Sequence, residues 1–445
     1  MRSKQIFIYP VVIIFFSVGI YILINKISNR NIPTLNPRSG DSNISAEFLN
    51  AQRAVDYYRE KIEKDPDVIQ NYVELAQIFL QEARISGDHH EYIKDALTLI
   101  EEALSRQPQN FEVMVTKASI QMTLHQFKQA KVLIEKAIKL NDFNASAYGI
   151  LCDANVELGF YDEAVKACDK MLSIRPDLRS YSRASYIREI HGEKQAAIDA
   201  MLLAANSGVT GQENRAWALH NLAKMLLEQG KLDSSKFIFE GILEERPNYP
   251  YALSGLAQIY GVKRDYKKSV ELIEKSYRYV QDHGFLEQLA DYYQVMGNKT
   301  KEEEFIEKAL FEFAEHERDG WNVNHEFAVF CLKHNINLKE SLERARKDYK
   351  FRPTNIDALN IYAWALHKNG KSKDAVKYIE QAMRLNTNRG IMLYHAGMIH
   401  NSVGEKNLSE KYLRLALKEN PSLFPLYIDN TNKILASLGN VAVQY

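Results

Sequence analysis

Neighbouring histidine and carboxylate side chains are the first residues in this sequence that could do chemistry. His325 and Glu326 are adjacent, as in zinc-dependent peptidases, but that motif needs a second histidine one helical turn on, where Val329 stands. His395 and His400 are five residues apart, and no set of carboxylates accompanies them. Because a zinc site needs three or four converging ligands, we expect no metal site at either pair.

The cysteines offer little redox or metal chemistry. Cys152, Cys168 and Cys331 form no Cys-x-x-Cys pair, which argues against a zinc ribbon and against a thioredoxin-like site. Cys152 and Cys168 flank Gly159 almost symmetrically, so they can approach each other across a helical turn. Both stand at packing positions, which favours buried free thiols. A disulfide between them is the alternative, although its geometry is restrictive.

No catalytic motif is found elsewhere in the chain. A Gly-x-x-x-x-Gly-Lys-Ser/Thr phosphate loop and a Gly-x-Ser-x-Gly nucleophile turn are both missing from the sequence. Glu302, Glu303 and Glu304 are adjacent, and adjacent helical residues point in different directions, so they are typical of a solvated helix start. We therefore predict a protein that is not an enzyme and that uses no cofactor and no small-molecule substrate.

Length and charge narrow the class of protein further. With 445 residues the chain is too long for one compact core, so it holds several domains or an array of units. Its 46% hydrophobic and 26% charged residues are typical of a folded protein. Lys+Arg and Asp+Glu both number 57, and this lack of a basic excess argues against nucleic acid as a partner.

The elements that position these side chains recur every 34 residues. Ala96, Ala130 and Ala164 show this spacing, as do Gly370 and Gly404. Each unit has two amphipathic stretches of helical period around a short turn. Six turns carry a glycine that can close the first helix, at 159, 192, 230, 297, 370 and 404. Proline follows the second helix at 66, 108, 176, 247, 353 and 421.

With this period and these residues the chain resembles the tetratricopeptide repeat family, a 34-residue helix–turn–helix pattern. The resemblance covers about residues 46–421, in roughly ten units. The residues that carry it are Leu222-Ala223, Leu256-Ala257 with Tyr260, Leu289-Ala290 with Tyr293, Tyr362-Ala363, Ala396-Gly397, Ala164, Met171, Ala375, Ile379, Ala382, Leu413 and Ala416. The resemblance implies an all-α fold, an α-α superhelix or solenoid of stacked hairpins.

The predicted organisation has six parts. Residues 1–25 form a transmembrane anchor, 26–45 a flexible linker, and 46–205 an N-terminal repeat array that opens with a capping helix. Residues 206–214 form a polar break and possible hinge, 215–421 a C-terminal array, and 422–445 a capping helix and tail. Two stretches depart from the pattern: 86–92 would lengthen a turn, and 317–353 lacks a turn glycine.

The anchor rests on Ile6 to Ile24, nineteen residues without a charge. At 1.5 Å per residue they span about 28 Å, close to the ~30 Å hydrocarbon core of a bilayer. A cleaved secretory signal is the alternative. The numbers of basic residues on the two sides of the span are nearly equal. Their positions favour a single-pass protein whose body lies on the extracytoplasmic (periplasmic) side. A body on the cytoplasmic side is the alternative.

The resemblance also implies a binding surface, because the first helix of each hairpin lines the concave groove in this family. Two groove patches follow from that mapping: Trp364, His367, Tyr394 and Met398, and Trp217, His220, Lys224 and Tyr251. The alternative is that both tryptophans pack between hairpins. The carboxylate clamp of some relatives is missing from the matching segments.

We therefore predict a membrane-tethered scaffold or assembly factor that binds a partner peptide or protein subunit in its groove. The alternative functions are a regulatory or accessory subunit of a membrane-associated enzyme or secretion complex, and a self-assembling structural element.

Overall fold

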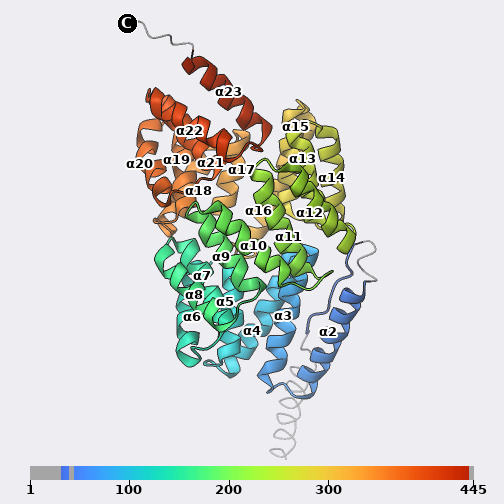
Figure 1. The fold of residues 1–445 in the computed structure, drawn as a ribbon. Helices are drawn as coiled ribbons and strands as arrows, with labels where there is room; N and C mark the ends of the chain where they lie inside the picture. Colours follow the sequence, from blue (N-terminus) through green and yellow to red (C-terminus); the bar gives the residue numbers. More distant parts are fainter. Residues whose placement is uncertain (1–31, 40–44, 440–445) are drawn as a thin grey trace, which may run out of the picture.

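The computed structural model of the chain describes residues 32–39 and 45–439 (Figure 1). Over these residues the regular structure is helical throughout. The helices of the first half are α2 (Ala46–Lys64), α3 (Ile69–Ser86), α4 (His89–Arg106), α5 (Phe111–Thr123), α6 (Phe127–Leu140), α7 (Ala145–Leu158), α8 (Tyr161–Ile174), α9 (Leu178–Ile190), α10 (Lys194–Asn206), α11 (Glu213–Glu228) and α12 (Leu232–Glu245).

The second half continues in the same manner. Its helices are α13 (Pro250–Val262), α14 (Tyr266–Tyr279), α15 (His283–Val295), α16 (Lys299–Arg318), α17 (Asn324–His334), α18 (Leu338–Phe351), α19 (Ile356–Lys368), α20 (Ser372–Ala382), the 3₁₀ helix η2 (Met383–Leu385), α21 (Gly390–Ser402), α22 (Lys406–Glu419) and α23 (Pro425–Gly439). Within the described part of the chain, helices α3 to α22 pair into ten antiparallel hairpins, and α2 and α23 stand at the two ends. The predicted all-α solenoid is confirmed.

Left-handed turn residues close the hairpins as the sequence pattern requires. Gly159, with φ of 78°, follows α7 and lets the chain reverse into α8. In the stretch 317–353, where glycine is missing from the pattern, Asn335 adopts the same conformation with φ of 56° after α17. Asparagine tolerates this region better than most residues. The loosely matching stretch therefore forms an ordinary hairpin, α17–α18.

The stretch 86–92 does not lengthen a turn, and this prediction was wrong. Helix α3 ends at Ser86, Gly87 takes the left-handed conformation, and α4 begins at His89. The surplus residues extend the two helices to 18 residues each. A longer helix keeps its backbone hydrogen bonds, which a longer loop would have to satisfy with water or side chains.

The polar break at 206–214 is a loop between α10 and α11, and the core continues across it. Met201 and Ala205 before the loop share one hydrophobic cluster with Ala218 and Leu222 after it. Shared packing of this kind resists relative motion of the two arrays.

Part of the expected flexible linker is docked on the first helices. In the described residues 32–39, Ile32 and Leu35 are buried, and the Arg38 guanidinium donates to both oxygens of Glu82 at 2.9 and 2.6 Å. A two-pronged contact of this kind fixes the segment in place. The predicted span at 6–24 lies outside the described residues, and none of the helices inside them is long and apolar enough to cross a bilayer.

The solenoid turns so tightly that its second half lies against its first (Figure 1). We call α2–α12 the first winding, α13–α23 the second winding, and the line of contacts between them the seam. Ion pairs cross the seam between Glu157 and Arg352 and between Glu189 and Arg389, with sequence separations of 195 and 200. Glu47 of α2 pairs with Arg246, which follows α12, at a similar separation of 199. One superhelical turn therefore takes about six repeats of 34 residues.

Candidate functional site

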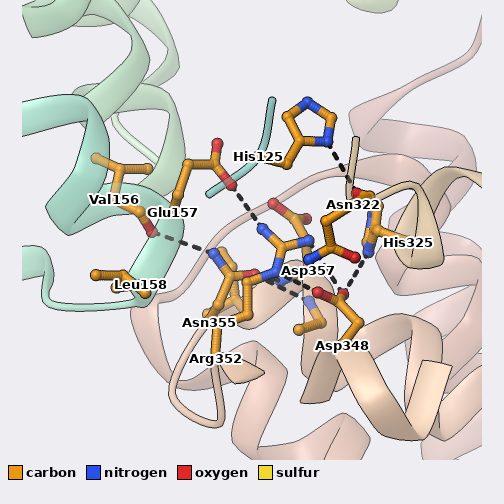
Figure 2. A network of polar contacts seen from close by, with 12 residues as sticks. His125, Val156, Glu157, Leu158, Asn322, His325, Asp348, Arg352, Asn355 and Asp357 are labelled. Atoms are coloured by element: carbon orange, nitrogen blue, oxygen red, sulfur yellow. Dashed lines mark hydrogen bonds and ion pairs between the residues drawn. The ribbon is translucent and has the colours of Figure 1, made fainter. Parts of the chain in front are cut away.

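A cavity of about 330 Å³ lies at the seam, between helices of both windings. Its walls come from segments that are far apart in the sequence, which Figure 2 shows as ribbons of different colours facing each other. The first winding contributes Met122, His125, Phe127, Asp153, Val156, Glu157 and Tyr186, and the second Asn322, His325, Glu326, Asp348, Arg352 and Asp357.

Arg352, the residue directly after α18, connects the two windings in this cavity. Its Nη1 donates to Glu157 Oε2 of the first winding at 2.6 Å. Its Nε and Nη2 donate to the two oxygens of Asp348 at 2.7 and 3.1 Å. Arg352 and Asp348 are only 5% and 4% exposed. Buried charges of this kind are stable only when they are paired and hydrogen-bonded, so the three side chains act as one unit.

His325 completes the pairing of Asp348, with its Nδ1 2.8 Å from Oδ2. Burial alone would raise the pKa of Asp348, but the hydrogen bond from His325 and the charges of His325 and Arg352 outweigh it and hold the pKa below its usual range. For His325 burial would lower the pKa, and the neighbouring Asp348 raises it instead. Both shifts favour the ionic form of the pair.

The loop after Arg352 forms hydrogen bonds with the C-terminal end of α7 in the first winding. Asn355 Nδ2 donates to the Val156 carbonyl at 3.1 Å, and Thr354 Oγ1 donates to the Leu158 carbonyl at 3.0 Å. The Tyr161 hydroxyl accepts from the Ile356 N–H at 2.9 Å. The last carbonyls of a helix have no partner within the helix, and here the second winding supplies partners from its own side chains.

The cavity has more carboxylates than cationic groups. Asp153, Glu157, Glu326, Asp348 and Asp357 line it, against the guanidinium of Arg352 and two imidazoles. One Glu326 oxygen, Oε2, is buried without a hydrogen-bond partner, while Oε1 lies 3.5 Å from His125. Burial raises the pKa of Glu157 even though Arg352 opposes this. Arg183 pairs with Asp153, and Arg389 pairs with Asp357. Glu326 Oε2 is therefore the acceptor that the cavity offers to a donor group.

The first predicted groove patch lies inside the packed structure. Trp364 is 6% exposed and stacks on His367 and His395, with ring centroids 4.8 and 4.1 Å apart. Tyr394 is 3% exposed and packs against Tyr427 of α23 at 4.8 Å. Met398 packs on the same cluster. Trp364 is thus placed as the packing alternative describes, and a partner-binding role for this patch stays a prediction.

The second predicted patch is partly accessible. Trp217 keeps 39% of its surface exposed near the start of α11. His220 and Tyr251 lie together, with ring centroids 6.0 Å apart, and the Tyr251 hydroxyl donates to Asp282 at 3.1 Å. Burial lowers the pKa of His220 to about 3, helped by the nearby charge of Lys224. Partner binding by these four residues also stays a prediction.

The cysteines are free and buried, as first interpreted. Within the residues that the structure describes, no group of three or more histidine, cysteine, aspartate or glutamate side chains is arranged to hold a metal ion.

The seam residues are the ones that no pattern in the sequence brings together. Glu157 and Arg352 look like ordinary helix-surface charges, and only the pitch of the superhelix brings them together.

Comparison with protein families identifies two of the hairpins. A sequence model described as tetratricopeptide repeat matches residues 356–389 and 391–423, which hold α19–α20 and α21–α22. The chain contains tetratricopeptide repeats. A tetratricopeptide repeat fold is consistent with a scaffold for protein–protein interaction. A search of curated protein sequences found no similar protein.

Several solved structures with tetratricopeptide repeats are similar to this chain. A thermophilic TPR protein of Thermus thermophilus is 21% identical over 40% of this chain and 92% of its own, with a TM-score of 0.36. The Cut9–Hcn1 assembly of the APC/C gives 11% identity over 87% and 94%, with a TM-score of 0.38. PilF of Pseudomonas aeruginosa gives 16% over 47% and 95%, with a TM-score of 0.37. Likenesses this remote give no basis for transferring a partner to this chain.

Proposed function

We propose that this protein is a membrane-tethered scaffold that binds a segment of a partner protein in the cavity between its two windings. The observation that carries the proposal is the cavity itself, whose polar side chains come from helices of both windings (Figure 2). A partner that enters it contacts two parts of the superhelix at once. Such a partner gains oriented polar contacts in a partly desolvated site, where they are strongest.

The chemistry of the lining favours a partner segment that brings donors. Glu326 Oε2 has no hydrogen-bond partner and is available to an incoming N–H or O–H group. The proposed anchor at 6–24 would concentrate the scaffold beside membrane-bound partners, so that weak contacts suffice. We place its soluble body on the extracytoplasmic side.

Site-specific photocrosslinking tests the binding surface. A diazirine amino acid placed at Met122, which lines the cavity outside its polar network, should yield one discrete crosslinked partner when the full-length chain is illuminated in its own membranes. The same amino acid at Glu163, an exposed position on α8 outside the cavity, is the matched control and should yield none. Equal adducts from both positions, or adducts from Glu163 alone, would move the binding surface away from the cavity.

The anchor has a separate test. Alkaline carbonate extraction should leave the full-length chain in the membrane pellet, because a spanning helix is held by the hydrophobic effect and not by charge. Deletion of residues 1–25 should move the protein to the soluble fraction. Protease added to intact cells or spheroplasts would show on which side of the membrane the folded part of the protein lies. Release of the full-length chain by carbonate would refute the membrane anchor, and the proposal that the cavity binds a partner would be unaffected.

A further inference from the structure

A cluster of histidines lies on the seam beside the cavity, which it meets at His125. His89 and His90 begin α4 in the first winding. His283, which begins α15, and His316, near the end of α16, belong to the second winding, with ring centroids 5.4 Å apart. Two hairpins, one from each winding, thus place four imidazoles in one region, although the residues span more than half of the sequence.

Trp321 is the centre of this region. It follows α16 in the second winding and stacks on His316 at a centroid distance of 5.0 Å. Towards the first winding its indole contacts the rings of His89 and His125, each at 5.8 Å. The next residue, Asn322, donates its backbone N–H to the Leu124 carbonyl at 3.2 Å, and His90 pairs with Asp319. These contacts hold the first and second windings together at this point.

We propose that the Trp321-centred cluster is a proton-operated clasp, which holds the windings together while His89 and His316 are neutral and releases them when these two histidines are protonated. The reason is the cost of placing charge there. His89 Nδ1 is buried without a hydrogen-bond partner, and the imidazoles of His283 and His316 are in edge contact. Imidazolium ions on the neighbouring rings would repel one another, and a proton on His89 Nδ1 would have no acceptor. His90 takes no part in the release, because protonation would strengthen its pair with Asp319.

The pKa shifts have the sign that such a clasp requires. Burial lowers the pKa of His316 to about 4, and the charges of His283 and His89 add to this effect, while Asp319 and Asp282 oppose it. Burial also lowers the pKa of His89, opposed by Asp282 and Asp88 and reinforced by His283. Three further carboxylates face the other two histidines: Glu312 faces His90 and His283, Glu287 lies 3.8 Å from His283, and Glu91 lies 3.9 Å from His90. The net direction at both His89 and His316 favours the neutral ring in the closed state.

The pH window follows from linkage. A histidine freed from the cluster regains its ordinary pKa of 6.5. The open state therefore binds protons more tightly than the closed state does. Closure is therefore fully favoured above about pH 6.5 and weakens as the pH falls towards 4. Between about pH 7.5 and pH 5, complete release of His316 alone would raise the opening constant by up to roughly thirtyfold.

Hydrogen exchange measured by mass spectrometry tests the clasp, with the full-length chain in detergent. After correction for intrinsic exchange rates, peptides covering residues 319–326 should lose protection by about tenfold or more between pH 7.5 and pH 5. Peptides from the hairpin core of α7 should stay protected. Unchanged exchange at 319–326, or loss of protection in both regions together, would overturn the clasp.

Two variants make the test specific to the histidines. His316→Phe keeps an aromatic ring against Trp321 but cannot take up a proton, so the midpoint of opening should fall by about one pH unit. Adding His89→Phe should remove most of the remaining pH dependence. His220→Phe is the matched control, a buried histidine outside the seam with a lowered pKa, and should leave the midpoint in place. Equal shifts in His316→Phe and His220→Phe would mean global unfolding and would refute the proposal.

Discussion

Replacement of Gly159 with alanine should part the two windings while leaving the hairpins folded. Gly159 adopts φ of +78° at the turn between α7 and α8, and a β-carbon there would lie 2.3 to 2.5 Å from backbone atoms of Thr354 and Asn355. Backbone atoms cannot rotate away as a side chain can, so the clash is relieved only if the windings separate. The hairpins themselves pack on their sequence neighbours and need no seam to stay helical.

Gly370→Ala is the matched control for this experiment. Gly370 closes the α19–α20 turn with φ of +75°, and a β-carbon there meets nothing within 4 Å. It should cost only the strain of the left-handed conformation, about 1–2 kcal/mol. Gly159→Ala should lose about 2–3 kcal/mol more in urea denaturation and increase the radius of gyration in small-angle scattering. Equal losses in the two variants, with no expansion, would show that the seam contributes little.

The repeat and its hairpins could be predicted because they depend on local spacing. Ala130 and Ala164, 34 residues apart, are both fully buried, since small side chains at these positions let paired helices approach closely. Where the consensus glycine was missing, Asn335 supplied the same backbone conformation. The pattern is thus a set of conformational requirements, which different residues can satisfy.

The seam could not be predicted, because it depends on the pitch of the superhelix. Pitch accumulates from small rotations between successive hairpins, and a few degrees per unit decide whether two windings touch. Glu157 and Arg352 are joined across 195 residues, and neither carries a local signal of that contact. The same accumulated rotation creates the cavity, so its lining was equally hidden.

The first groove patch shows how the end of the array changes the surroundings of a position that recurs in each repeat. In a middle repeat, the face that holds Trp364 and Tyr394 would look into the groove. Here the capping helix α23 follows, and its Tyr427 packs on Tyr394 with ring centroids 4.8 Å apart. His395 stacks on Trp364 from the neighbouring hairpin. An array needs such a cap to cover its last apolar face.

Replacement of Arg352 with methionine should also have a large effect on stability. Methionine fills much of the same volume but removes the partner of Asp348, which is 4% exposed and has His325 as its other cation. Removing one member of a buried ion pair typically costs about 3–5 kcal/mol, because the remaining charge is left uncompensated. Urea denaturation at pH 7 should show this loss. Arg414→Met, which breaks the exposed Arg414–Glu410 pair on α22, should change stability by about 0.5 kcal/mol or less.

The pH dependence of the Arg352→Met variant separates lost charge pairing from lost packing. The Asp348 carboxylate has a lowered pKa in the wild-type protein, so its contribution to stability is present above the ordinary value of 3.8 and is lost as the pH falls below it. The stability difference between wild type and variant should therefore be greatest near neutral pH and shrink below about pH 4, where protonation removes the unpaired charge. A cycle with Glu157→Gln then isolates the part of the Arg352 contribution that crosses the seam. A difference that stays constant with pH would mean that Arg352 acts by filling space and not by its charge.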